Sequence, residues 1–158
     1  MKFILPLACL FLLSCSKDVG KREGLRINES VFLDSINHSA SFNYYKNDSG
    51  AVYSGVHGPH GPFKLRFNKR AFSALSQMGK LPPGSAMPEG ALVIKELVNA
   101  SSQTITYYYM YKYRNSWLWG KMTSKGEVQS SIYADPAGCV NCHNQTGNVD
   151  QIVAFYFY

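Results

Sequence analysis

Residues 104–113 read TITYYYMYKY and form a long β-prone run, rich in aromatic and β-branched side chains. Successive side chains of a strand point to opposite faces, so the run divides into two sets. One face carries Ile105, Tyr107, Tyr109, Tyr111 and Tyr113, and the other carries Thr106, Tyr108, Met110 and Lys112. A turn at Asn115-Ser116 and a strand over 117–122, with Trp117 and Trp119 on one face, follow. Short turns between consecutive strands predict an antiparallel sheet.

Further strands and helices are predicted on both sides of this hairpin. Residues 63–67 alternate between apolar and basic side chains as a half-buried strand does, and residues 91–98 and 128–133 also read as strands. Asn68 is placed to cap a helix that ends at Gly79, with an apolar stripe of Ala71, Phe72, Leu75 and Met78. The sequence therefore predicts an α+β fold, mainly an antiparallel β-sheet with a few helices packed on it.

Residues 139–143 read CVNCH, the C-x-x-C-H attachment signature of a c-type haem. Cys139 and Cys142 would form thioether bonds to the haem vinyl groups, because the two-residue spacer brings both thiols to one porphyrin edge. His143 follows directly, so its imidazole can ligate the iron. The motif predicts one covalently attached haem c with His143 as a metal ligand.

Two other sites use similar residues. A thioredoxin-like redox pair would need a strand-to-helix setting and no histidine after the second cysteine. A zinc site would need two more ligands, and the mature chain offers no second cysteine pair. The histidine therefore favours haem attachment.

The first residues are typical of an export signal. Lys2 precedes an apolar segment, residues 3–13, that is too short to span a bilayer. The segment ends in LLSC, which resembles a bacterial lipobox with Cys15 as the lipidated residue; an ordinary secretory peptide with a leftover thiol is the alternative. We expect a signal peptide over 1–14, a tether and N-terminal segment over 15–50 and a haem domain over 51–158. The protein would then be periplasmic and anchored to a bacterial membrane through Cys15.

Composition narrows the class of protein further. The 158 residues are 46% hydrophobic and 16% charged, which suits one globular domain. The net charge of +6 fits an acidic redox partner or an anionic membrane surface as well as an ordinary lysine-rich surface. No basic run or nucleic-acid motif is visible, so the sequence predicts no nucleic-acid partner.

A second iron ligand has few candidates. His57 and His60 lie among glycine and proline in a predicted loop and could serve as ligands or as ordinary loop residues. No methionine follows His143, and the upstream methionines are as suited to core or loop positions. A six-coordinate electron-transfer cytochrome stays as the alternative to an open haem.

Lys95 has an unusual position in its strand. In residues 91–98 it shares a face with Val93 and Leu97, and a lysine is seldom buried without a partner. The ordinary arrangement for such a lysine is a packed stem with an ammonium group that reaches water or pairs with a carboxylate.

The order of these pieces resembles the cytochrome P460 and cytochrome c′-β family. The resemblance covers residues 63–158 and rests on NKRAF at 68–72, VIKELV at 93–98, MYK at 110–112, the two tryptophans, CVNCH and Asp150 before an aromatic tail. It implies a five-coordinate haem that binds or oxidises small nitrogen species. P460 members oxidise hydroxylamine, whereas c′-β members bind nitric oxide.

The resemblance also assigns roles to particular residues. Lys95 matches the lysine that P460 members bond covalently to the porphyrin, and Phe72 is a candidate for the phenylalanine that caps the distal side in c′-β members. The distal carboxylate of the catalytic members would fall near Tyr108, yet residues 103–124 contain no Asp or Glu. This departure weakens the expectation of hydroxylamine oxidation, which needs a base. A homodimer and a partner cytochrome for electron transfer are further expectations.

Overall fold

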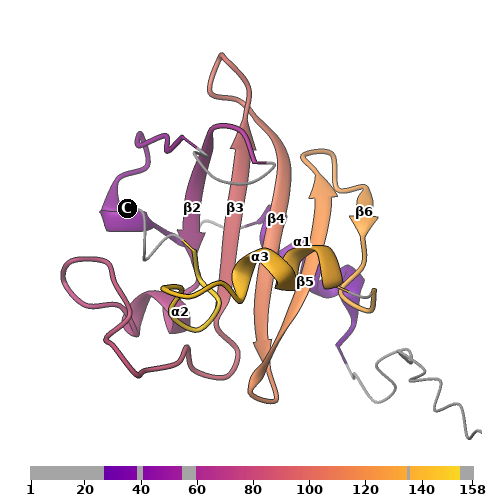
Figure 1. The fold of residues 1–158 in the computed structure, drawn as a ribbon. Helices are drawn as coiled ribbons and strands as arrows, with labels where there is room; N and C mark the ends of the chain where they lie inside the picture. Colours follow the sequence, from indigo (N-terminus) through magenta and orange to yellow (C-terminus); the bar gives the residue numbers. More distant parts are fainter. Residues whose placement is uncertain (1–26, 39–40, 55–59, 135, 154–158) are drawn as a thin grey trace, which may run out of the picture.

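The computed structural model describes residues 27–38, 41–54, 60–134 and 136–153. The lipidation site predicted at Cys15 and the candidate ligand His57 lie outside these ranges. The fold is α+β, with a six-stranded antiparallel sheet whose strand order follows the chain. The strands are β1 Asn43–Tyr44, β2 Phe63–Phe67, β3 Leu92–Val98, β4 Thr104–Tyr113, β5 Ser116–Thr123 and β6 Val128–Ser130 (Figure 1).

The β4–β5 hairpin forms as predicted, with its turn one residue earlier than expected. Arg114 and Asn115 have φ values of 50° and 58°, which fits a two-residue turn of the left-handed type that matches strand twist. The carboxylate of Glu89 accepts both turn N–H groups, at 2.7 Å from Arg114 N and 3.4 Å from Asn115 N. The turn is therefore anchored by the preceding loop.

The two faces of the sheet have different covers (Figure 1). Helix α1, Glu29–Asn37, lies behind the sheet and buries Leu33 and Ile36 against it. Helix α3, Ala137–His143, crosses the front, where Cys139 and Val140 contact the hydrophobic core on that side of the sheet. We call these the α1 face and the α3 face. The alternation predicted for β3 and β4 is confirmed: Ile94 and Tyr109 lie in the α1-face core, and Val93 and Met110 in the α3-face core.

Two adjacent side chains fix the N-terminal end of helix α1. Asn28 caps the helix, because its side-chain oxygen accepts the N–H groups of Ser30 and Val31. The carboxylate of Glu29 accepts from Ser131 Oγ and from Ile132 N, both at 2.8 Å. This segment therefore packs against the sheet and belongs to the domain, although it falls within the expected N-terminal segment.

One basic residue of β2 is buried, contrary to the half-buried strand that the alternation predicted. Arg66 lies on the α1 face, where its Nη2 is 2.6 Å from Oε1 of Glu96 on β3. Three aromatic rings flank the guanidinium, with centroids 5.6 to 5.9 Å away: Phe42, Tyr44 and Tyr107. The ion pair and the rings together replace water around Arg66.

Helix α2 is much shorter than its apolar spacing predicted. It covers Lys69–Ser73, with Asn68 confirmed as the N-cap through a 2.9 Å bond to Ala71 N. The chain then turns through a loop in which Ser76 N donates to Lys80 O and Gly79 N donates to Ser76 O. Met78 is 74% exposed, so it is no core residue. Gly79, at φ 73°, lies against the ring of Tyr45 in the short 3-10 helix η1, Tyr45–Asn47.

The C-terminal part differs from expectation in one place: the strand expected over 128–133 stops at Ser130, and Ile132 instead enters the α1-face core. The motif lies on helix α3, which begins after Pro136. Residues 149–152 form a tight turn with a single bridge between Val149 and Ile152. No helix in the described ranges is long and apolar enough to cross a membrane.

Candidate functional site

Helix α3 brings the three residues of the haem motif together. Cys139, Cys142 and His143 stand at positions i, i+3 and i+4, which lie on one side of a helix. Cys139 is half-buried against the α3-face core and Cys142 is exposed, and neither forms a disulfide. Two free thiols and an imidazole therefore share one helix surface above the sheet.

His143 is held by a hydrogen bond that decides its tautomer. Its Nδ1 lies 2.6 Å from the carbonyl oxygen of Gln151, and because a carbonyl can only accept, Nδ1 carries the proton. Nε2 then keeps its lone pair, as a metal-binding imidazole requires. The ring also meets the indole of Trp119 edge-on, with centroids 4.6 Å apart. Burial and the charge of Lys95 lower the pKa of His143, which favours the neutral ring.

The carbonyl that accepts from His143 sits on an anchored, strained turn. Asp150 and Gln151 have φ values of 48° and 65°, a region that non-glycine residues seldom adopt. Asp150 Oδ1 lies 2.7 Å from Lys112 Nζ, and Oδ2 accepts from Met87 N at 2.7 Å. The Asp150 carbonyl accepts from Trp117 Nε1 at 3.0 Å. Three bonds to the sheet and its flanking loop thus compensate for the backbone strain.

Sequence reasoning missed this anchor. The only signal was Lys112, which the alternation of β4 places beside Trp117 on the α3 face, where a lysine needs an anionic partner. Asp150 lies 38 residues further along the chain, and no local pattern connects it to Lys112.

Lys95 shares the α3 face with Val93, as the alternation predicted, and the structure places the motif over this face. It is half-buried, and its Nζ stands 3.8 Å from the centroid of the Phe63 ring. Burial lowers the pKa of Lys95 to about 8. Within the described residues no carboxylate pairs with it, since its neighbour Glu96 points to the other face and binds Arg66.

Tyr108 and Lys95 are direct cross-strand partners, and Lys121 continues the pairing on β5. On the same face, two residues along each strand, a second cross-strand row consists of Val93, Met110 and Trp119. Trp119 of this second row contacts His143. The ring of His60 meets Tyr108 edge-on at 4.7 Å. The structure therefore brings together Lys95, Tyr108 and one of the two candidate histidines near His143.

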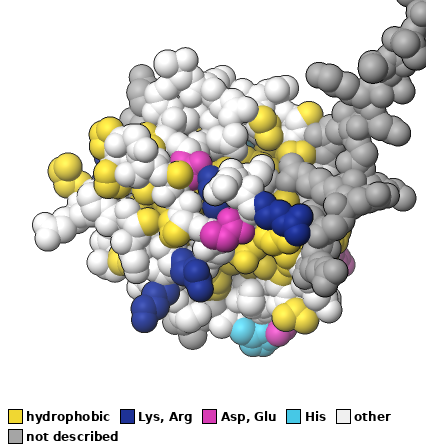
Figure 2. Space-filling model, turned by 90° about the horizontal axis from the view of Figure 1, so that it is seen from below, with side chains coloured by type: hydrophobic (Ala, Val, Ile, Leu, Met, Phe, Trp, Pro, Cys, Tyr) yellow, Lys and Arg dark blue, Asp and Glu magenta, His cyan; other side chains and the backbone are white. Residues whose placement is uncertain are grey.

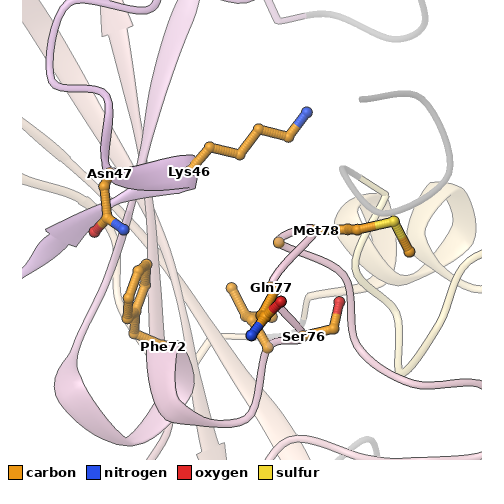
Figure 3. Close-up of a pocket in the computed structure, with 8 residues that line it drawn as sticks. Lys46, Asn47, Phe72, Ser76, Gln77 and Met78 are labelled. Carbon is orange, nitrogen blue, oxygen red and sulfur yellow. The ribbon is translucent and has the colours of Figure 1, made fainter.

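Phe72, the candidate for the distal side, lies on helix α2. It packs beside the α3-face core and lines a cavity of about 540 Å³ between α2, the following loop and η1. Figure 3 shows Lys46 and Asn47 on one side of this space and Ser76, Gln77 and Met78 on another. Neither Lys95 nor His143 lines this cavity.

A second hollow of about 980 Å³ opens where β3 begins and β4 ends, on the side of α1. Phe32, Phe42, Tyr111 and Tyr113 line it together with Arg70 and Glu89. Figure 2 shows hydrophobic side chains exposed at this end beside basic and acidic ones. None of the motif residues takes part in it.

Comparisons of the chain with family models, with curated proteins and with solved structures found no match.

The thiol of Cys139 lacks the lowered pKa that is typical of a redox cysteine. Burial raises the pKa of the Cys139 thiol, and the neighbouring Cys142 adds to the rise, whereas a redox cysteine of the thioredoxin type has a lowered pKa. In the described ranges no group of three or more His, Cys, Asp or Glu side chains is placed to hold a metal ion. One imidazole with two free thiols fits haem c, because the porphyrin itself supplies the other iron ligands.

Proposed function

We propose that the protein is an exported mono-haem cytochrome of the P460 and c′-β type that binds a small nitrogen species such as nitric oxide. The observation that supports this most directly is the tautomer of His143. With Nδ1 donating to Gln151 O at 2.6 Å, Nε2 faces away from that bond as a ligand, next to two thiols that form no disulfide. A haem iron bound by one imidazole supplies an open coordination position for a diatomic ligand.

The residues near this position favour binding over oxidation of hydroxylamine. The family's distal carboxylate would stand near Tyr108, whose cross-strand neighbours are Lys95 and Lys121. Neither neighbour can accept a proton while it is an ammonium group, and no Asp or Glu occurs between residues 103 and 124. Oxidation of hydroxylamine at this site would need a base other than Lys95, Lys121 or a carboxylate from residues 103–124.

Lys95 is the residue that would bond to the porphyrin. Support comes from its half-buried position on the motif face, the lowered pKa of about 8 and the lack of a carboxylate partner among the described residues. An amine that is readily deprotonated is a better nucleophile than an exposed lysine. Replacing a porphyrin C–H bond by a C–N bond to this amine releases two electrons and two protons, so the step also needs an external two-electron oxidant. Export and lipidation at Cys15, and electron exchange with another cytochrome, complete the proposal.

The experiment is expression of the full chain in a bacterial host that attaches haem c. We expect a Soret band, haem that stays on the chain in denaturing gels, and a ferrous five-coordinate high-spin spectrum that changes when nitric oxide binds. Cys139→Ser with Cys142→Ser should abolish covalent haem. A chain without haem in the competent host would refute the proposal.

The mass of the trypsin-released haem peptide tests the role of Lys95. A peptide containing Lys95 joined to the haem peptide, with a ferrous band displaced to the red, indicates a bond to the porphyrin. Separate peptides indicate the nitric-oxide-binding type without that bond. Lys95→Arg is the matched control, because it keeps a cation and removes the amine.

A six-coordinate electron-transfer cytochrome is the second candidate. One observation favours it: His60 Nδ1 is buried and has no hydrogen-bond partner among the described residues, so it could serve as a ligand. A low-spin spectrum that becomes high-spin in His60→Leu would establish this candidate and exclude the first.

A further inference from the structure

The surface beside His143 has an unusual charge pattern. Lys95, Tyr108 and Lys121 form one cross-strand row on β3, β4 and β5, and His60 packs on the tyrosine. We call these four residues the lysine row. Lys121 Nζ stands 5.1 Å from the Tyr108 ring centroid, and Lys95 Nζ stands 3.8 Å from that of Phe63. Both ammonium groups thus rest on aromatic rings.

No acidic side chain in the described part of the chain balances these charges. The ion pairs found there join His38 with Asp34, Arg66 with Glu96 and Lys112 with Asp150. Glu96 neighbours Lys95 in sequence but points to the opposite face. Two lysines in one cross-strand row without a carboxylate partner create a positive potential at this surface, which attracts anions and repels cations.

His60 adds a hydrogen-bonding group to this surface, next to Tyr108. Its Nδ1 is buried and has no partner among the described residues, and an unsatisfied buried nitrogen is uncommon in folded proteins. Burial and the positive charges of Lys95 and Lys121 lower the pKa of His60 to about 4, so the ring is neutral at ordinary pH. A neutral imidazole can present an N–H to an acceptor oxygen without adding a charge.

We propose that the lysine row binds a small oxyanion of nitrogen, of the class of nitrite, beside the iron position. This inference rests on the proposed function, because it names the ligand class of the same site. Lys121 supplies the charge and His60 the directional hydrogen bond, so both remain even where Lys95 is bonded to the porphyrin. Protonated hydroxylamine, a cation, is disfavoured at the same place.

The haem's own propionate carboxylates share this chemistry, since they too are oxygen anions. The two sources are distinguished by their consequences. Propionates that face Lys121 are fixed to the ring, so loss of the lysine changes the midpoint potential and leaves nitrite affinity unchanged. If Lys121 binds nitrite instead, loss of the lysine lowers the nitrite affinity.

The experiment is a titration of the ferric holoprotein with sodium nitrite, followed by the Soret band, and a parallel nitric oxide titration of the ferrous form. We expect Lys121→Gln to lower the ratio of nitrite affinity to nitric oxide affinity about tenfold, since a hydrogen bond to a charged group is lost. Lys121→Arg should restore the ratio, His60→Leu should lower it, and rising salt should weaken nitrite binding. Lys125→Gln, in the exposed turn between β5 and β6, is the control and should leave the ratio unchanged.

The outcomes separate the inference from the proposed function. Covalent haem that binds nitric oxide but not nitrite overturns the inference and leaves the function in place. An unchanged ratio in both Lys121→Gln and His60→Leu, or a change in midpoint potential alone, also overturns it. Absence of covalent haem overturns both.

Discussion

Lys112 Nζ and Asp150 Oδ1 lie 2.7 Å apart, with the two side chains only 6% and 13% exposed. This buried ion pair joins β4 to the turn that presents the Gln151 carbonyl to His143. The orientation of the proposed iron ligand therefore depends on residues that do not touch it.

Asp150→Asn tests this dependence. The variant leaves the Lys112 ammonium buried without a counter-charge, so we expect the free energy of unfolding to fall by about 3 kcal/mol. In the haem-loaded protein the Fe–His stretching band should shift, because the Gln151 carbonyl is less firmly held. Chemical denaturation and resonance Raman spectroscopy measure the two effects.

Asp34→Asn is the matched control for that variant. Asp34 pairs with His38 on α1, and the side chains are 71% and 77% exposed. Its loss should change stability by less than about 0.5 kcal/mol, as for exposed ion pairs in general. Equal losses in the two variants would contradict the anchoring role of Asp150.

The Arg66–Glu96 pair is expected to cost nearly as much by desolvation as it gains by attraction. Burial raises the pKa of Glu96 although the charge of Arg66 opposes the rise. Arg66→Met should therefore destabilise the protein by about 3 kcal/mol by leaving Glu96 unpaired, whereas Arg66→Met with Glu96→Leu should be close to neutral. A double-mutant cycle in urea measures this difference; additive losses would contradict it.

Gly120 is expected to tolerate no side chain. A Cβ there would lie 2.2 Å from atoms of the Tyr109 ring, which covers the glycine from the paired strand. Gly120→Ala should lower stability by about 3 kcal/mol because the buried ring must move. Gly138→Ala, where a Cβ meets nothing within 4 Å on helix α3, should instead stabilise by about 1 kcal/mol. Thermal unfolding of the two variants distinguishes them, and a mild loss at Gly120 would refute the close contact.

His60 should make stability depend on acid. Its pKa falls from 6.5 to about 4 on folding, so between these values the unfolded chain binds more protons than the folded one. The free energy of unfolding should therefore decrease as the pH drops from 6.5 to 4, by about 2 kcal/mol from this residue. His60→Gln should have a flatter profile over that window, and an unchanged slope would show that the ring is exposed to water.

The sheet could be predicted because its signals are local. The period-two alternation of residues 104–113 fixed both faces of β4, and the tryptophan pair did the same for β5. The end of α2 could not be predicted in this way, since Met78 keeps helical spacing while hydrogen bonds between Ser76 and Lys80 turn the chain away. Helix α3 could not be predicted either, because it is short and has no apolar period of its own. Its Cys139 and Val140 pack against the core on the sheet.

The candidate site was predictable in its residues and not in its arrangement. The motif identified the thiols and His143, and the alternation of β3 placed Lys95 beside Val93, whereas the position of the motif over that face came from the structure alone. The pairing of Lys95 with Tyr108 depends on the register set by the turn at Asn99–Gln103, where Asn99 N donates to Gln103 O. Contacts between distant segments, such as Lys112 with Asp150, leave no pattern in one sequence.

The strand order of the sheet, which equals the order of the chain, has a consequence for how the molecule is made. Each new strand can add to the one before it. The strands from β3 to β6 are joined by short loops, so this part of the sheet can assemble rapidly, whereas longer segments join β1 to β2 and β2 to β3. Helix α3 follows all six described strands in the chain and lies on the sheet that they form. A maturation enzyme that acts on the cysteines would thus meet a nearly finished domain with one segment still to dock.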